Sequence, residues 1–551
     1  MINKIKIFFA SRFGKALLVL AVFIFSFAVR ALPLLQKKYP MDNDAVQMVL
    51  ARNIYFGLGY KMETKDGIIL APSLVAERAM PASNPYVGVS LAYALLFKIF
   101  GFAKNLFLPM MTTLLAHAAV TALLFLLVKK MFNWGMALVF ALFDIFLPII
   151  IKGSLAPELY EFAAPAFTVG LLFYLYTKSA KPAPWRLIFA GVFFTLAIFA
   201  RNAMMFSYGA FVVYEFYKNR SWKRALLFIL PGILIAGGAL LYAIPRNYAT
   251  GFAGGMIGKT TFPSQFYSHI FPDAYTYNYD QTNYFASGGD KSSVYNEPFM
   301  AYGRKYSLKE YLAIYAKPAT GTILGFFPLI VWGGPLILLL FVFGVIFLYR
   351  EKRELFELLI IWFIVWFAGL FFARTVNWTH YLELEFIFVL TISVGFYWLM
   401  KLLLKSEMSK KIKYVLFVTA VIFTLVHLID ANKWMLHENY RGDMQGVMID
   451  VAAHLNGRQL TDKDVIATGF GTRSQYILNY LTGLNYIYFN PETLQRLIKE
   501  NRLTDAFKIY NVNKIIGYTS ELSDAVAKAA KVESLATDNH VWEETHIIDY
   551  K

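Results

Sequence analysis

The sequence predicts an α-helical protein that crosses a membrane many times. Hydrophobic residues make up 58% of the 551 residues, aromatic residues 17% and charged residues only 16%. Soluble globular domains carry about 25% charged residues, so this composition lies outside their range. Long apolar segments recur along the chain, and in a bilayer such segments are stable as helices because a helix satisfies its own backbone hydrogen bonds.

About eleven apolar segments are candidates for spans of roughly 17–25 residues. They lie near residues 16–35, 106–128, 134–151, 160–177, 186–200, 203–217, 225–245, 322–348, 355–373, 383–404 and 412–430. Basic residues precede the first span, as in a signal sequence, but no clear small-x-small cleavage site follows it. We therefore expect an uncleaved first span.

The positions of Lys and Arg predict the orientation in the membrane. Basic residues are dense in the short segments 129–130, 178–181, 218–224, 350–353 and 405–413. Such loops stay on the cytoplasmic side, so the N-terminus is predicted to be cytoplasmic. The apolar stretch 86–100 must then lie along the outer surface, because counting it as a span would invert every later loop.

Charge and cysteine content exclude several classes of function. The net charge of +17 is explained by the basic loops, so we expect no nucleic-acid partner. The chain has no cysteine, which excludes a disulfide framework, a thiolate metal site and a cysteine nucleophile.

Three long segments are predicted to lie together on the outer face. They are the loops 36–105 and 246–318 and the tail 431–551. An odd number of crossings places the tail outside the cytoplasm, in the periplasm or the extracellular space. We therefore divide the chain into a transmembrane domain, residues 1–430, and a small outward-facing domain, residues 431–551.

The tail has the pattern of an α/β domain. Residues 464–469 and 512–518 are short apolar runs typical of buried strands, and residues 491–502 have the periodicity of an amphipathic helix.

Carboxylates near the outer ends of spans are the candidates for catalysis. Asp42 and Asp44 follow the first span, and Glu158 follows the third. One such carboxylate can remove the proton of an acceptor hydroxyl while that oxygen attacks C1 of a sugar donor. The two aspartates could also hold Mg²⁺ or Mn²⁺ through oxygen ligands. The structural alternative is that these acids cap the helices that follow them.

Cationic and hydrogen-bonding residues at the outer ends of spans are the candidates for binding a phosphate. They are Arg201, Arg246, Arg374, His380 and Tyr381. Arginine matches phosphate geometry, and a leaving phosphate needs its developing charge stabilised. The alternative is that each arginine anchors a lipid headgroup.

Asp144 lies inside an apolar span, where a carboxylate costs roughly 2.5–3.5 kcal/mol. It must be paired, protonated or functional. His117 and Lys152 are the expected structural partners.

Four segments together resemble the GT-C superfamily of membrane glycosyltransferases. The segments are Asp42-Asn-Asp44 followed by Ala51-Arg52-Asn53 and Gly57-Leu-Gly-Tyr60, Pro85-Tyr86 followed by residues 94–101, Ala156-Pro157-Glu158, and Pro245-Arg246-Asn247-Tyr248. The nearest groups are the protein O-mannosyltransferases and the lipid A aminoarabinose transferases. The chain departs from the pattern at Gln47 and Met48, where the family often has Tyr, and has Asp-Asn-Asp where many members have Asp-Glu.

The resemblance implies a GT-C fold and inverting transfer of one sugar. The donor would be a polyprenyl phosphate sugar and the acceptor a glycan, lipid or protein at the outer face. Asp44, Asp42 and Glu158 would be catalytic, and Tyr86 would contact substrate. Relatives that transfer single sugars generally use no metal, and the Trp-Trp-Asp motif of oligosaccharyltransferases is absent from the chain. We therefore expect no metal cofactor, with Mg²⁺ or Mn²⁺ at Asp42 and Asp44 as the alternative.

Three other functions are retained as alternatives. They are an oligosaccharyltransferase, a transporter or flippase of a lipid-linked sugar, and a non-catalytic accessory protein. A transporter predicts ionisable residues distributed through the spans, whereas here they are few.

Overall fold

The fold was analysed in a computed structural model. It describes residues 11–35, 46–57, 87–155, 160–175, 183–201, 203–243, 334–371, 383–439, 444–457, 460, 464–468, 472–488, 491–501 and short segments between 503 and 549.

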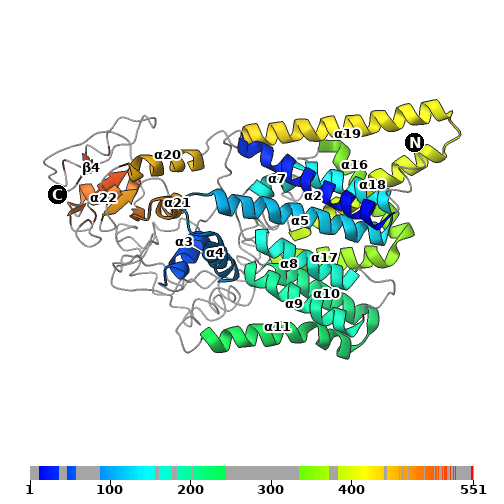
Figure 1. Cartoon of the computed structure of the whole chain (residues 1–551), viewed down its shortest axis with the longest axis horizontal. Coiled ribbons are helices and arrows are strands. Elements are labelled where there is room, and N and C mark those ends of the chain that lie inside the picture. The colour runs from blue at the N-terminus through cyan, green and yellow to red at the C-terminus, as the bar shows by residue number, and fades with distance from the viewer. Residues whose placement is uncertain are drawn as a thin grey trace, which may run out of the picture.

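Among the described residues, twelve helices form one bundle in which their axes run in roughly the same direction (Figure 1). They are α2 (Arg12–Leu35), α5 (Phe107–Met131), α6 (Trp134–Phe146), α7 (Pro148–Leu155), α8 (Tyr160–Leu175), α9 (Pro184–Ala200), α10 (Met204–Asn219), α11 (Trp222–Ala243), α16 (Gly334–Glu351), α17 (Arg353–Phe371), α18 (Glu385–Lys405) and α19 (Lys410–Asn439).

Each predicted span overlaps a helix of this bundle, and the span 134–151 is divided into α6 and α7. Of the span 322–348, residues 322–333 lie outside the described part of the chain. The break has a local cause. Leu147 caps α6 in an extended conformation (φ −66°, ψ 125°), as a residue before proline prefers, and Pro148 then begins α7. The helical, polytopic membrane class is confirmed, whereas the number of crossings stays a prediction.

The helices differ in how much apolar surface they leave exposed. Within the described part of the chain, four helices are long and apolar enough to cross a bilayer by themselves: Phe13–Pro33, Phe107–Met131, Glu385–Lys405 and Lys410–Lys433. In the most apolar 18-residue stretch of the first of these helices only 22% of the residues are buried within the protein, and in that of the last only 11%. Their exposed side chains include Leu20, Ile24 and Val415. Such surface is stable in lipid, so α2 and α19 belong at the margin of the bundle.

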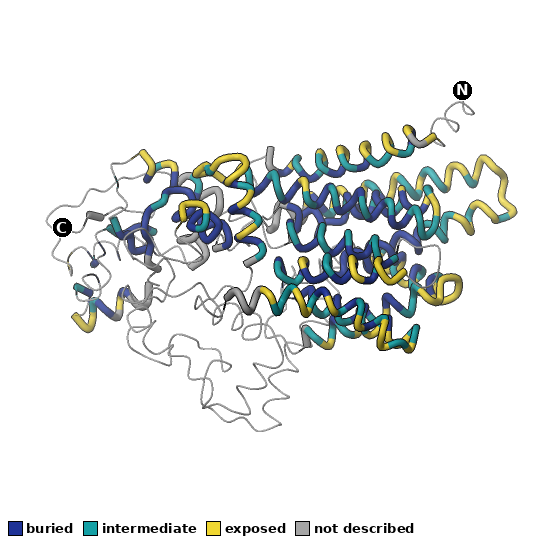
Figure 2. Tube along the Cα trace, turned by 60° about the horizontal axis from the view of Figure 1, so that its bottom comes forward, coloured by how far each residue is buried: buried dark blue, intermediate teal, exposed yellow. Residues whose placement is uncertain are grey.

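The centre of the bundle is built around α18. Every residue from Glu385 to Phe396 is buried, and Figure 2 shows buried residues concentrated inside the bundle. Glycines let α16 and α18 approach closely, because a Cβ at Gly344 would overlap the carbonyl group of Thr391 and one at Gly395 would overlap that of Leu340. Small residues allow the same close backbone contact in other membrane bundles.

The basic connections gather at one end of the bundle, where the N-terminal end of α2 also lies (Figure 1). Lys218 at the end of α10 pairs with Glu354 and Glu357 of α17. The connection between α18 and α19 projects from this end and is exposed (Figure 2).

Two short helices lie at the opposite end. They are α3 (Val46–Tyr55) and α4 (Val87–Phe100), and they pack against each other. Sequence analysis expected the apolar stretch 86–100 not to cross the membrane, and α4 covers most of it. At 14 residues α4 is shorter than a span.

The C-terminal region is an α/β unit beside α3 and α4 (Figure 1). Its elements are α20 (Met444–Asn456), β1 (Val465–Thr468), α21 (Thr472–Thr482), β2 (Asn485–Tyr488), α22 (Pro491–Lys499), β3 (Lys514–Ile516) and β4 (Ile548–Asp549). The strand order is β2-β1-β3-β4. Ile466 of β1 is in register with Tyr486 on one side and Lys514 on the other, both in parallel, and β4 is antiparallel to β3.

The sequence predicted part of this unit. Strands β1 and β3 and helix α22 are confirmed. Strand β2 was missed because Asn485-Tyr-Ile-Tyr488 has only four residues and begins with asparagine, which is depleted in strands, although Asn485 is fully buried.

Candidate active site at the end of the bundle

Most predicted site residues lie outside the described part of the chain. They are Asp42, Asp44, Tyr86, Glu158, Arg246, Arg374, His380 and Tyr381. The described elements next to them are nevertheless informative. Helix α3 begins two residues after Asp44, α4 directly after Tyr86, and α8 two residues after Glu158.

These elements converge at one end of the bundle. Tyr93 of α4 contacts Glu161 of α8, and the backbone of α4 at Gly88 lies against Phe199 of α9. Arg201, directly after α9, contacts Glu383, just before α18. The described ends of α4, α8 and α9 therefore lie close together.

Arg201 is the one predicted site residue that the structure describes. Its Nε atom lies 2.9 Å from Oε1 of Glu383, and Nε1 of Trp366 donates to Oε2 of the same carboxylate at 2.8 Å. Only 5% of Arg201 and 2% of Glu383 is exposed. The guanidinium group is therefore oriented by a buried acid. Sequence analysis missed Glu383, although it stands directly after the segment containing His380 and Tyr381.

Glu161 is a second buried acid that sequence analysis missed. It lies three residues after Glu158 and is 2% exposed. The hydroxyl group of Tyr93 donates a hydrogen bond to its Oε1 atom at 2.5 Å. Burial, and then the neighbouring carboxylate, raise the pKa of Tyr93 well above its ordinary value, so the phenol stays protonated and remains a donor. This bond ties α4 to the start of α8.

Asp144 is paired inside the bundle. Arg30 Nη2 lies 3.2 Å from Asp144 Oδ2 and donates to its carbonyl oxygen at 3.0 Å. Thr121 donates to the same carboxylate oxygen. Arg30 and Asp144 are both fully buried. The prediction that Asp144 is paired is confirmed, but the prediction of His117 as the partner was wrong because it overlooked Arg30, which is 114 residues away in the sequence. The side chain of Lys152, the other expected partner, lies outside the described residues.

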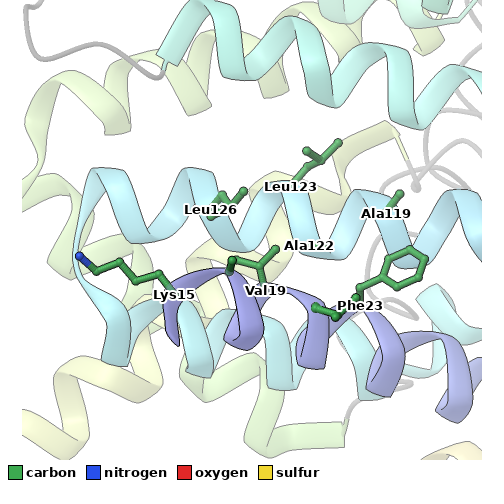
Figure 3. Close-up of a pocket in the computed structure, with 9 residues that line it drawn as sticks. Lys15, Val19, Phe23, Ala119, Ala122, Leu123 and Leu126 are labelled. Atoms are coloured by element: carbon green, nitrogen blue, oxygen red, sulfur yellow. The ribbon is translucent and has the colours of Figure 1, made fainter. Parts of the chain in front are cut away.

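A groove between α2 and α5 lies away from the converging loops (Figure 3). It has a volume of about 570 Å³ and an almost wholly apolar lining. Lys15 stands at one end of it, in the N-terminal half of α2, whereas α3 and α4 lie at the other end of the bundle. The groove is therefore separate from the candidate active site.

The expectation of no metal cofactor, with Mg²⁺ or Mn²⁺ at Asp42 and Asp44 as the alternative, stays a prediction. Among the described residues, no cluster of three or more His, Asp or Glu side chains has the arrangement of a metal site. Asp42 and Asp44 lie outside those residues.

Comparisons of sequence find no relatives. No protein-family model matches the chain, and no curated protein matches it.

Comparisons of structure do find neighbours. The chain is similar to ArnT from Cupriavidus metallidurans bound to undecaprenyl phosphate, with a TM-score of 0.56, 12% identity and coverage of 98% of this chain and 99% of that one. The apo structure of the same protein gives a TM-score of 0.53. An oligosaccharyltransferase of Archaeoglobus fulgidus, solved with zinc and sulfate, gives 0.52 at 13% identity, covering 92% of this chain and 69% of that one.

The similarity extends over nearly the whole chain, while the identity is low enough that it speaks for the fold alone. This chain therefore shares the fold of ArnT.

Proposed function

We propose that the protein is an inverting glycosyltransferase that moves a single sugar from a polyprenyl phosphate donor to an acceptor hydroxyl. The observation that carries this proposal is the convergence of α3, α4, the start of α8 and the Arg201–Glu383 pair at one end of a GT-C bundle. These elements adjoin the acidic and cationic residues that such a reaction needs.

In the proposed reaction, Asp44 or Asp42 accepts the proton of the acceptor hydroxyl. The acceptor oxygen forms a bond to C1 of the sugar from the face opposite the phosphate. The bond between C1 and the phosphate oxygen breaks, and its electron pair leaves with the polyprenyl phosphate. Glu158 is a second candidate carboxylate.

Arginine side chains are proposed to stabilise the leaving phosphate. Arg201, Arg246 and Arg374 are the candidates, with His380 and Tyr381 as hydrogen-bond donors. Tyr86 is proposed to contact the substrate. For Arg201, the buried carboxylate of Glu383 would hold the guanidinium group in one orientation.

The active site is proposed to face the periplasm or the extracellular space. The basic connections lie at the opposite end of the bundle from α3 and α4, and basic loops prefer the cytoplasmic side. A lipid-linked donor would reach such a site from within the bilayer.

An oligosaccharyltransferase is the second candidate, supported by the similarity to the Archaeoglobus fulgidus structure. We favour a single sugar, without a metal cofactor, because the chain has no Trp-Trp-Asp sequence. A peptide acceptor tested with an oligosaccharide donor and a monosaccharide donor would separate the two functions.

The proposal is tested by measuring transfer of radiolabelled sugar from a panel of polyprenyl phosphate donors. Wild type is compared with Asp44→Asn and Asp42→Asn, with and without EDTA, and Arg353→Gln at the exposed basic end serves as the control. We expect one aspartate variant to lose transfer and EDTA to have no effect. Loss of transfer with EDTA would establish the metal alternative. A wild-type protein that binds donors without transferring sugar would favour the transporter or accessory function.

A further inference from the structure

The C-terminal region is attached to the first loop through the last turn of α21. Arg52 Nη1 of α3 donates to the carbonyl oxygen of Asn479 at 2.7 Å. Lys104 Nζ, just before α5, donates to the carbonyl oxygen of Thr482 at 2.8 Å. The C-terminal end of a helix carries partial negative charge, so two cations from the N-terminal part of the chain stabilise it.

An apolar contact lies beside these two hydrogen bonds. The ring of Tyr480 packs against Phe97 of α4 and Phe102, with ring centroids 6.2 and 5.6 Å apart. Tyr480 and Phe97 are each only 1% exposed. We call this contact, formed by Arg52, Lys104, Phe97, Phe102 and Tyr480, the α21 junction.

Arg52 is an unusual side chain to bury. It is 8% exposed, and burial lowers its pKa to about 10, so it is still charged at neutral pH. The cost of removing the guanidinium group from water must be offset by its partners, which are the Asn479 carbonyl group and the side chain of Asn53. A cation that only stabilised the C-terminal end of α3 could do so while exposed to solvent.

The α21 junction contacts α3, the helix that follows the proposed catalytic aspartates in the sequence. Asp44 stands two residues before α3, and Arg52 lies in the last turn of that helix. The orientation of α3 therefore determines where the carboxylate of Asp44 can reach. We infer that the C-terminal α/β region is a positioning element for the catalytic loop, and that Arg52 is a positioning residue acting through α3. The inference rests on the proposed function.

The inference predicts a specific kinetic signature. Loosening α3 displaces the base without removing the groups that bind the donor phosphate. Displacement of a catalytic group by about 1 Å can lower the rate about 100-fold. The kcat should fall while the KM for the donor is unchanged.

The first experiment measures kcat and KM for purified full-length Tyr480→Ala and Arg52→Met, with Arg52→Lys as the conservative variant. Lys499→Ala, exposed on α22 away from the junction, is the control. We expect the first two variants to lose about 100-fold in kcat and Arg52→Lys to recover part of it. An unchanged kcat in folded Tyr480→Ala overturns the inference.

A reversible crosslink between positions 102 and 480 distinguishes a loss of positioning from a loss of folding. Because the chain has no cysteine, Phe102→Cys and Tyr480→Cys can be combined and joined by a short bifunctional thiol reagent with a disulfide inside it. We expect low activity in the unbridged protein, recovery after bridging and loss again on reduction. Full activity before bridging, or no recovery after it, contradicts the inference.

Amide hydrogen exchange over residues 46–55 tests the junction independently of activity. Faster exchange in Tyr480→Ala than in wild type supports the role of α21 in holding α3, and equal exchange overturns it. If wild type transfers no sugar from any donor, the proposed function fails, and the exchange result still decides whether α21 holds α3.

Discussion

At the residue scale, the buried ion pairs show where single side chains stabilise the bundle. Arg30 on α2 meets Asp144 on α6, and Arg201 after α9 meets Glu383 before α18. Each pair joins segments that are distant in sequence, and each is almost inaccessible to solvent. Removing one partner leaves the other charge buried and alone, which is costly in a medium of low dielectric constant.

For the first pair, we expect Arg30→Met to destabilise the protein by about 3–5 kcal/mol. The double variant Arg30→Met with Asp144→Leu should recover much of this loss, because apolar residues often replace a buried pair at little cost. Unfolding in detergent, followed by tryptophan fluorescence, measures both. Equal destabilisation by the single and double variants would show that Arg30 and Asp144 are not coupled.

For the second pair, we expect Glu383→Gln to cost more stability than Trp366→Phe. The first leaves a buried arginine without its counter-charge, at about 3–5 kcal/mol. The second removes one hydrogen bond to a charged group, at about 1.5–3 kcal/mol. The same unfolding measurement ranks the two variants, and the reverse order would mean that the indole group, not the ion pair, holds Glu383.

At the scale of elements, helix contacts in this bundle depend on backbone proximity. Helices α16 and α18 approach so closely at Gly395 that even a methyl group would overlap the carbonyl group of Leu340. By contrast, a Cβ at Gly237 of α11 would meet no atom within 4 Å. The two glycines therefore have opposite roles in stability, although both lie inside helices.

We expect Gly395→Ala to destabilise the protein because α16 and α18 must move apart. Gly237→Ala should be neutral or stabilising by about 0.5–1 kcal/mol, since alanine favours the helix. Thermal unfolding of the two variants in the same detergent gives the comparison. A smaller effect at Gly395 than at Gly237 would contradict the close approach of α16 and α18.

At the scale of the whole molecule, charge is distributed asymmetrically along the bundle axis. The exposed connection between α18 and α19 is flanked by lysines at the helix ends, Lys405 and Lys410 among them. It projects from one end of the bundle, whereas the C-terminal α/β region lies at the other (Figures 1 and 2). This asymmetry predicts which end faces the cytoplasm.

We expect Lys499→Cys on α22 to react with a membrane-impermeant maleimide in intact cells. Lys410→Cys, at the start of α19, should react only after the membrane is permeabilised. Both lysines are exposed, and the absence of native cysteine removes background labelling. The opposite pattern would invert the orientation and exclude an outward-facing active site.

Local patterns in the sequence are enough to predict the class of fold, the approximate positions of the bundle helices, strands β1 and β3 and helix α22. All of these depend on local patterns of apolar and charged residues and on segment length. Which polar and charged groups meet depends on the tertiary structure. The partners Tyr93 and Glu161 are 68 residues apart, Arg30 and Asp144 114, Arg201 and Glu383 182, and Arg52 and Asn479 427. Such pairs form only when the chain path brings two helix ends together, and no local pattern encodes that path.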